Sequence, residues 1–239
     1  MFRYLLVIVV AQLLTASFSY TLSFAASLSG PEERIMRLQK KYQQLRSLEF
    51  DFSQTTLSSG RIKQGAGNAI FLRPTATGNL NTTPQGIMRW NYTSPTAQTI
   101  VNDGKTLSIY TPQDKQMIVS PAQDLESDIT YAIFTGTRNL HDEFKVDSGD
   151  ALFIINEPPA GLGSALLTPR QPHPQIKRLQ LWFTNELALH RLLMEDHFGA
   201  MTELTFSGIR FNSLRPGDQQ QVQTLLKIDI APGTEIIRQ

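Results

Sequence analysis

The residues best able to do chemistry in this sequence form an Asn-Asp-Gly-Lys run at positions 102–105. Such a run could belong to a calcium loop, to a phosphate-binding loop or to a turn. A calcium loop needs further acidic ligands at regular spacing and a closing glutamate, and a phosphate loop needs more glycines before its lysine. The run also lies between two short β-rich segments, whose pairing needs residues that tolerate a positive φ angle. It is therefore predicted to be a hairpin turn.

Other reactive residues show no catalytic or metal-binding spacing. The four histidines form no HExxH pattern, and on a strand Glu195 and His197 would share one face as solvated residues. Gly163-Ser164-Ala165 lacks the second glycine of a nucleophile elbow, and the chain has no cysteine. We therefore predict no metal and no cofactor. Carboxylates that meet only in the folded chain leave no motif, so a hydrolase with a spatially assembled acidic site stays an alternative.

The composition is that of a soluble globular protein. Hydrophobic residues make up 41% of the 239 residues and charged residues 18%, which excludes a disordered chain and a strongly charged partner of nucleic acid. The first 25 residues have Arg3, an apolar run and then small residues around Ala25, as a secretory signal does. We expect residues 1–25 to be cleaved and residues 26–239 to form a single domain. Without Arg3 the net charge falls from +1 to zero.

The rest of the chain alternates between strand patterns and a few short helices. Ile35, Leu38, Tyr42 and Leu45 form one apolar stripe, which predicts a helix whose start has Ser29 and Glu32 at capping-box spacing. A second helix is predicted between Ser127 and Leu140, and the proline-rich stretch 157–175 is predicted to be a long loop. Strand-like patterns cover residues 48–53, 68–73, 87–92, 99–101, 106–110, 116–119, 144–146, 152–155, 176–184, 187–194, 202–211 and 225–230.

About ten or eleven strands with so few helices favour one large, strongly curved antiparallel sheet or open barrel. The apolar stripes of the short helices would then lie against its concave face as a lid, with Tyr42 on the first of them. Large apolar side chains at strand positions, including Phe52, Met88 and Trp90, would line an apolar cavity beneath that lid.

Several segments, in order, resemble the periplasmic outer-membrane lipoprotein carrier family, LolA. They are LRSLEFDFSQ, GAGNAIFLRP, MRWNYTSPTAQTIVNDGKTLSIYTPQDKQM, ITYAIFTGTRNLHDEFKV and IAPGTEII. The resemblance implies an unclosed β-barrel with a helical lid over an apolar cavity. It also implies a monomeric periplasmic chaperone without enzymatic activity. Its cargo would be acylated lipoproteins, taken from an inner-membrane ATP-driven transporter and passed to an outer-membrane receptor or to the outer membrane itself.

The resemblance also implies roles for individual residues. In FLRP, Arg73 matches the arginine that hydrogen-bonds lid backbone and keeps the empty cavity shut. Cavity-lining positions fall on Phe71, Trp90, Tyr92 and Ile100, and lid positions on Tyr131, Ile133 and Phe134.

Two departures from the family pattern leave alternatives open. Residues 75–87 intervene between the RP and RW segments, which makes Arg89 a rival for the lid contact, and the 157–175 loop is longer than usual. The family's docking surfaces for the transporter and the receptor are therefore not assigned to residues of this chain. A lipid-binding sensor or a lipid-transfer module of the same fold is the alternative function.

Overall fold

The computed structural model describes residues 30–73, 86–125, 128–136, 138–215 and 217–239. The strands of the first half are β1 (Ser47–Ser58), β2 (Arg61–Leu72), β3 (Ile87–Ser94), β4 (Gln98–Asn102), β5 (Thr106–Thr111) and β6 (Gln116–Pro121). Those of the second half are β7 (Phe144–Ser148), β8 (Gly163–Pro169), β9 (Arg178–Phe183), β10 (Leu189–Glu195), β11 (Met201–Phe211) and β12 (Glu235–Arg238). The helices are α1 (Pro31–Gln43), the 3-10 turn η1 (Ala122–Leu125), α2 (Ile129–Thr135), α3 (Leu140–Glu143) and α4 (Gln219–Leu226).

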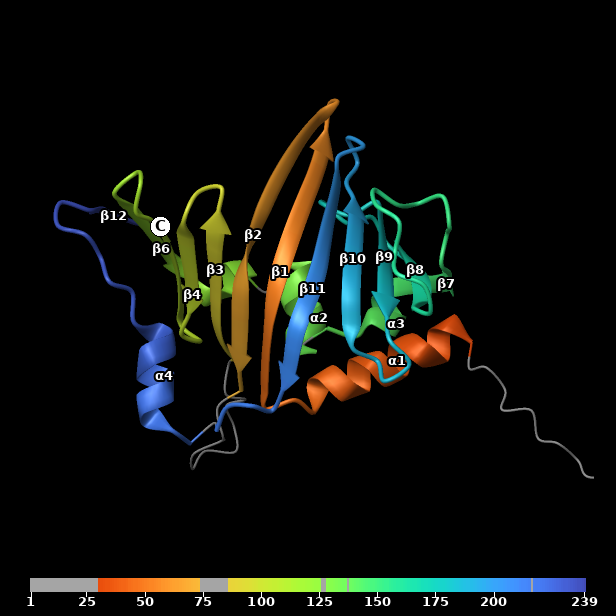
Figure 1. Cartoon of the computed structure of the whole chain (residues 1–239), viewed down its shortest axis with the longest axis horizontal. Helices are drawn as coiled ribbons and strands as arrows, with labels where there is room; N and C mark the ends of the chain where they lie inside the picture. The colour runs from red at the N-terminus through yellow and green to blue at the C-terminus, as the bar shows by residue number, and fades with distance from the viewer. Residues whose placement is uncertain (1–29, 74–85, 126–127, 137, 216) are drawn as a thin grey trace, which may run out of the picture.

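All twelve of these strands form one sheet, in the order β12-β6-β5-β4-β3-β2-β1-β11-β10-β9-β8-β7. Two series of neighbouring strands run outwards from β1, with β2 to β6 on one side and β11 to β7 on the other (Figure 1). Within the described residues the end strands β12 and β7 do not pair, so the barrel is unclosed. The predicted fold class is confirmed, with one parallel pair, β12 beside β6, as the exception to the antiparallel pattern.

The cross-strand register explains how the inner face becomes apolar. Leu48, Phe50 and Phe52 alternate with polar residues along β1, so all three point to one side of the sheet. Phe50 lies opposite Ala69 of β2, which in turn lies opposite Trp90 of β3. Residues directly opposite one another share a face, and this row therefore places large apolar groups from distant parts of the chain side by side.

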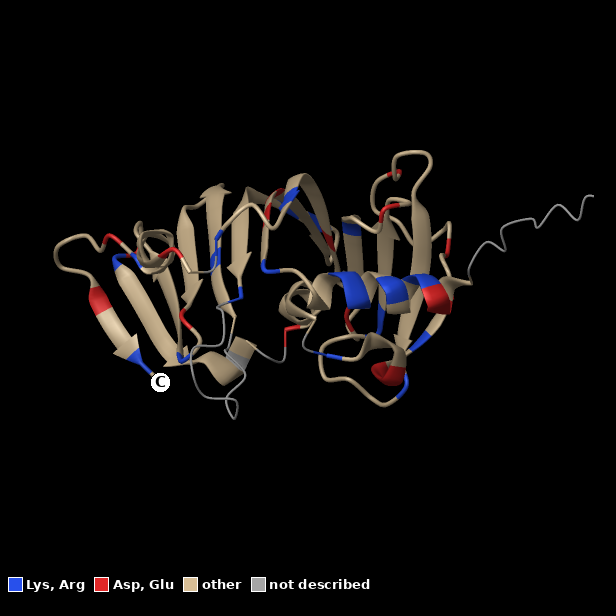
Figure 2. Cartoon of the chain, turned by 90° about the horizontal axis from the view of Figure 1, so that it is seen from below, with Lys and Arg blue, Asp and Glu red and all other residues tan. Residues whose placement is uncertain are grey.

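The helices cover different faces of the sheet (Figure 2). α1, α2 and α3 lie on the inner face, where the main hydrophobic core joins α1 and α2 to the central strands. α4 lies on the outer face, where Leu225 packs with Leu72 and Ile87. Further along that face, Phe153 packs with Trp182 and Leu193 beneath the 149–162 loop. No helix of the described residues is long and apolar enough to cross a membrane.

Two predictions about local structure between residues 149 and 175 are wrong. Residues 152–155 form no strand, because the Phe153 amide bonds back to the Asp150 carbonyl and Gln180 bonds both ends of this turn. The predicted loop 157–175 contains a strand, β8, which pairs with β7 and β9. The prolines of this stretch lie outside the strand or, at Pro169, at its last residue. Proline has no backbone N–H to donate, and it is tolerated at such a strand end.

The region after β11 also differs from its prediction. Residues 225–230 were predicted as a strand, but α4 covers Leu225 and the chain beyond it forms no ladder until β12. Asp218 begins this helix by accepting hydrogen bonds from the amides of Gln220 and Gln221. At the other terminus, α1 begins after Gly30 without a side-chain cap. The predicted cap Ser29 lies outside the described residues.

The Asn-Asp-Gly-Lys run is a hairpin turn between β4 and β5, as predicted. Asn102 Oδ1 accepts a hydrogen bond from the Gly104 amide at 2.8 Å, and Asp103 Oδ1 accepts from Lys105 and Thr106 at 2.8 and 2.7 Å. Gly104 has a φ angle of 91°, which only glycine adopts without strain. The Asn and Asp side chains are therefore occupied by the backbone of their own turn.

The turn predicts an acid-dependent contribution to stability. Partial burial raises the pKa of Asp103, but hydrogen bonds from Thr106 and Lys105 outweigh it and hold that pKa below its ordinary value. A carboxylate with a depressed folded pKa stabilises the protein above its unfolded pKa and loses this effect as the pH falls through the folded pKa. We expect Asp103→Ala to lower the unfolding free energy by about 1 kcal/mol at neutral pH. Urea titrations should show the difference from wild type narrowing below about pH 4.

Candidate functional site

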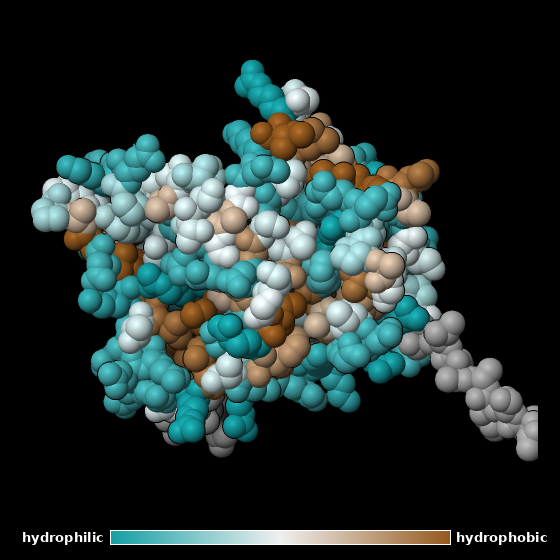
Figure 3. Space-filling model, viewed as in Figure 1, coloured by the Kyte–Doolittle hydropathy of each residue, from teal (hydrophilic) through white to brown (hydrophobic). Residues whose placement is uncertain are grey.

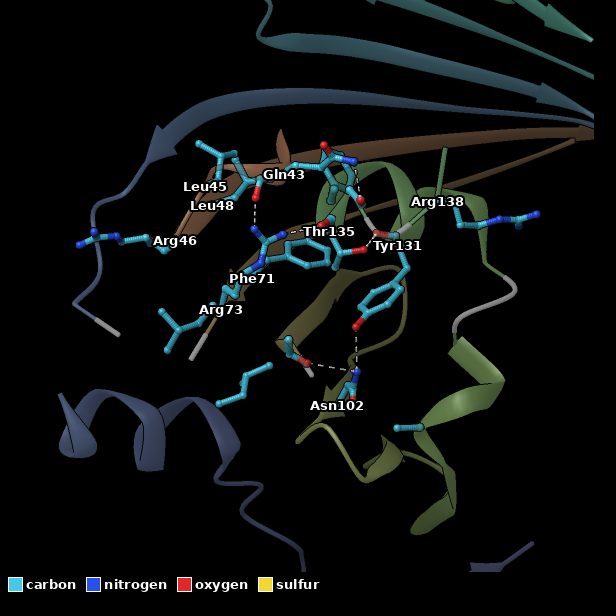
Figure 4. Close-up of a pocket in the computed structure, with 17 residues that line it drawn as sticks. Gln43, Leu45, Arg46, Leu48, Phe71, Arg73, Asn102, Tyr131, Thr135 and Arg138 are labelled. Atoms are coloured by element: carbon cyan, nitrogen blue, oxygen red, sulfur yellow. Dashed lines mark hydrogen bonds between the residues drawn. The ribbon is translucent and has the colours of Figure 1, made fainter. Parts of the chain in front are cut away.

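A cavity of about 750 Å³ opens between the inner face of the sheet and the ends of α1 and α2 (Figure 4). Its volume lies in the usual range of small-ligand pockets. The cavity is lined by Gln43, Leu45, Arg46, Ser47, Leu48, Phe71, Leu72, Arg73, Gly86, Ile87, Asn102, Ala122, Tyr131, Phe134, Thr135, Gly136 and Arg138.

Arg73 joins both helices of the lid to the sheet. Its guanidinium donates hydrogen bonds to the carbonyl of Gln43, the last residue of α1, and to that of Thr135, the last residue of α2. Figure 4 shows both bonds converging on Arg73 beside the ring of Phe71. One side chain from the end of β2 therefore ties two helices that are 92 residues apart in sequence at their C-terminal residues, 43 and 135.

The position of Arg73 is electrostatically favourable. The last carbonyls of a helix have no partner within the helix and carry the negative end of its dipole, so a cation is stabilised there. The last turn of α2 has no basic residue of its own. Burial lowers the pKa of Arg73 from its ordinary value, yet a guanidinium stays charged at neutral pH. Arg73 thus supplies the cation that α2 lacks.

The end of α2 also needs a glycine at position 136. Gly136 has a φ angle of 63° and accepts a hydrogen bond at its carbonyl from Gln43 Nε2. A Cβ at this position would lie 2.5 Å from Gln43 Cγ and 3.0 Å from its Cα. The start of α2 is fixed by Asp128, whose carboxylate accepts from the Tyr131 amide at 2.8 Å. Both ends of this short lid helix are therefore positioned by specific contacts.

A second contact joins the lid to the sheet through Asn102. Its Nδ2 donates to the hydroxyl oxygen of Tyr131 at 3.3 Å and to the Gly86 carbonyl at 3.4 Å. Its Oδ1 accepts from Gly104 in the turn. The residue that sequence analysis assigned only to a turn thus also contacts the lid.

An aromatic cluster fills the space beneath the lid. Phe50 is its centre, with ring centroids 4.7 Å from Phe134, 5.1 Å from Phe206, 5.7 Å from Trp90 and 6.0 Å from Phe71. Phe50 is stacked on Phe71 and tilted or edge-on to the other three rings, and such distances and angles are typical of favourable aromatic contacts. Phe134 of α2 therefore inserts among rings contributed by the three strands β1, β2 and β11 and by Tyr42 of α1.

The predicted lining residues lie together, although most of them lie outside the open cavity. Phe71 lines the cavity, whereas Phe52 and Trp90 pack against each other at 4.4 Å between centroids within the core. Tyr92 and Ile100 are half-buried against the same core, and Met88 is buried in it. The inner face is therefore largely occupied by its own side chains and by Phe134 in this closed arrangement.

The remaining lid residues belong to the same core. Tyr42 of α1 is buried and accepts a hydrogen bond from the Leu189 amide at 2.9 Å, and burial raises its pKa above the ordinary value. Tyr131 and Phe134 line the cavity, and Ile133 is buried in the core.

Arg89, the rival for the lid contact, lies on the opposite face of the sheet. It is one residue from both Met88 and Trp90 on β3, so its side chain points outwards. Its guanidinium donates to the carbonyls of Leu225 at 3.1 Å and Lys227 at 2.6 Å, at the end of α4. Arg89 therefore holds α4, whereas the lid is held by Arg73.

Sequence analysis did not assign Phe50, Asn102, Gln43 or Gly136 to the site. Phe50 has the same strand parity as Phe52, and Asn102 the same parity as Ile100, so these two could have been found from alternation alone. The contact between Gln43 and Gly136 depends on how two distant helices meet, and no local signal reports it.

The described lining of the cavity does not form the acidic site that the alternative hydrolase function would need. Its lining contains three arginines and no aspartate or glutamate. No group of three or more metal-binding side chains forms among the described residues. The arrangement is an aromatic interior covered by two helices, whose ends are joined by Arg73.

Comparison with known proteins agrees with this geometry. Residues 43–218 match the family model described as "Outer membrane lipoprotein carrier protein LolA". The chain belongs to this LolA family. The match covers β1 to β11, including Arg73, the aromatic cluster and α2. The LolA family is one of carriers, so the chain is a non-enzymatic lipoprotein-carrier protein by family.

Individual relatives support the LolA assignment across most of the chain. An outer-membrane lipoprotein carrier protein of Chromobacterium violaceum is 26% identical over 218 residues, covering 88% of this chain and 94% of the relative. One of Chromohalobacter salexigens is 27% identical over 220 residues, covering 90% of each. An uncharacterized conserved protein from Thermus thermophilus has a similar fold, with a TM-score of 0.51, 10% identity, and coverage of 87% of this chain and 98% of that chain.

Proposed function

We propose that this protein is a periplasmic chaperone that encloses the acyl chains of lipoproteins beneath its lid and carries them to the outer membrane. The observation that carries this proposal is the aromatic inner face closed by Phe134 and held shut by Arg73. In this proposal residues 1–25 direct export and are removed, and residues 26–239 act as a monomer.

The physical need for such a carrier is large. An acyl chain of about fifteen methylenes, at about 0.8 kcal/mol per methylene, costs about 12 kcal/mol when it is fully exposed to water. For a lipoprotein with several such chains, this free-energy cost makes free diffusion through an aqueous compartment negligible. A carrier must also release its cargo, so a cavity that its own side chains refill on closing is better suited than a permanently open one.

The lid provides the means of loading and release. An acyl chain would displace Phe134 from the rings of Phe50 and Phe71, and the bonds from Arg73 to both helix ends would break as the lid moves. When the cargo leaves, these contacts re-form. In this proposal an inner-membrane ATP-driven transporter loads the cavity, and an outer-membrane receptor or the outer membrane itself accepts the cargo.

Mass spectrometry of material bound to the protein from the periplasm of an expressing host tests the proposal. We expect acylated lipoprotein on the wild type and its loss from Phe71→Glu, which places a charge among the inner rings. The matched control is Ile70→Glu, one residue earlier and facing α4 on the outer side, which should keep its cargo. Free lipid as the sole ligand would instead indicate a lipid sensor or transfer module, and cargo on Phe71→Glu would contradict the proposed cavity.

A further inference from the structure

Two hairpin tips lie side by side at one end of the central strands of the sheet. The β1–β2 hairpin turns after Ser58, and the β10–β11 hairpin turns between Glu195 and Met201. Leu57 of β1 lies directly opposite Met201 of β11, so the two turns begin at the same level of the ladder. Figure 1 shows both tips pointing away from α1.

Both tips present large apolar side chains to solvent. Phe198, in the β10–β11 turn, is 97% exposed, and Ile62, next to the β1–β2 turn, is 66% exposed. Ile62, Leu57 and Met201 follow one another across three neighbouring strands and therefore share the outer face. Figure 3 views this face and shows hydrophobic side chains near its upper edge, beside hydrophilic ones that project from the same edge.

The β10–β11 tip is ordered by its own hydrogen bonds. Asp196 Oδ1 accepts from the amides of Phe198 and Ala200, both at 2.8 Å, and the Asp196 amide donates to the Ala200 carbonyl at 2.9 Å. A His197 ring nitrogen lies 2.6 Å from the His173 carbonyl oxygen in the neighbouring loop. The turn thus holds Phe198 outwards while satisfying much of its own backbone, which lowers the penalty for entering a less polar medium.

The charges beside the tips favour an anionic partner. Arg61 and Lys63 are exposed next to the β1–β2 turn, and residues 58–63 contain no acid. At the other hairpin the carboxylate of Glu195 is already paired with Lys177 at 2.7 Å and Arg178 at 2.5 Å. The carboxylate of Asp196 in that turn is occupied by the amides of Phe198 and Ala200. Among the described residues Arg61 and Lys63 form no ion pair, so the two cations outnumber this single carboxylate at the tips.

We propose that these two tips dock the protein onto the surface of an anionic phospholipid bilayer, with Phe198 and Ile62 entering the headgroup region. Apolar groups flanked by lysine and arginine are the features that bind proteins to such surfaces. A stable protein interface buries about 800 Å² on each partner, which is more than the few exposed apolar side chains of two separate tips provide. The docking deepens the proposed carrier function, since it names a surface through which the carrier meets a membrane.

Flotation of the exported protein with phosphatidylcholine vesicles that contain phosphatidylglycerol tests this docking. We expect wild type to float and the double variant Phe198→Ser/Ile62→Ser to lose binding by about tenfold or more, the usual effect of withdrawing one or two large apolar side chains. Pure phosphatidylcholine vesicles or high salt should weaken wild-type binding. Met36→Ser, which removes an exposed apolar side chain from α1, is the matched control and should float as wild type does.

Both substituted side chains are exposed, so the double variant should melt at the same temperature as wild type. Thermal melting of both proteins therefore serves as the control for a folding defect. Wild-type protein that does not float, or a double variant that floats equally well, would overturn the docking. If wild type binds purified outer-membrane proteins but no vesicles, and the double variant loses that protein binding, the result would overturn the membrane docking in favour of a protein partner. Vesicle binding needs no cargo, so it can fail while co-purified lipoprotein still supports the carrier function, and the reverse also holds.

Discussion

Arg73→Met should bind acylated peptides about tenfold to a hundredfold more tightly than wild type and release them correspondingly more slowly. In the closed protein the Arg73 guanidinium bonds the last carbonyls of α1 and α2. A hydrogen bond to a charged group contributes about 1.5–3 kcal/mol, and about 1.4 kcal/mol corresponds to a factor of ten. Because closing competes with cargo, any weakening of the closed state appears as a gain in apparent affinity.

Equilibrium binding of a palmitoylated peptide, with transfer of that peptide to acceptor vesicles, measures both effects. The matched control is Arg89→Met, which removes a similar pair of carbonyl bonds on the outer face, where the partners are Leu225 and Lys227. This control should leave cargo affinity unchanged. Equal affinity of Arg73→Met and wild type would show that the bonds from Arg73 do not oppose loading.

Phe50→Ala should lower the free energy of unfolding by about 3–5 kcal/mol, the usual effect of removing a buried phenylalanine ring. Phe50 contacts four other aromatic rings, and its neighbours belong to three other strands and to the lid helix α2. Those neighbours are fixed by separate parts of the fold and can close the resulting space only in part. The change should therefore remove both apolar burial and ring contacts.

Urea unfolding followed by circular dichroism measures the loss. Phe198→Ala removes the same ring from a position that is 97% exposed, so its unfolding free energy should remain within about 0.5 kcal/mol of wild type. A loss below about 1 kcal/mol for Phe50→Ala would mean that the inner face is loosely packed, and that closure does not depend on the aromatic cluster.

The elements that the sequence predicted well have strong local signals. β1 has strict alternation at Leu48, Phe50 and Phe52, and α2 has a capping aspartate at its start and Gly136 at its end. The elements that were missed have weak ones. The first half of β2, from Arg61 to Gly67, lacks an apolar face, and α4 has its apolar residues Val222, Leu225 and Leu226 at helical spacing over only eight residues. Pairing with β1 forms the first half of β2, whereas α4 is held by packing on Leu72 and Ile87.

In the site, too, local patterns predict some features and tertiary packing determines the others. Alternation predicts which side chains of β3 face inwards, and it separates Trp90 from Arg89 correctly once the register is known. The register itself depends on pairing with β2, which no local pattern reports. The meeting of α1 and α2 at Gln43 and Gly136 depends on tertiary packing. The resemblance to a family supplied Arg73, and the structure supplies the two helix ends that its charge stabilises.

The two tryptophans allow a direct test of whether acyl chains enter beneath the lid. Trp90 lies on the inner face beside Phe52, and Trp182 lies on the outer face beside Phe153 and Leu193. Trp182→Phe leaves Trp90 as the single fluorescent tryptophan, and Trp90→Phe leaves Trp182. Emission is compared after adding a peptide with a brominated acyl chain, which quenches on contact, and the same peptide without bromine. We predict quenching of Trp90 alone, whereas quenching of Trp182, or of neither, would contradict an acyl-binding cavity on the inner face.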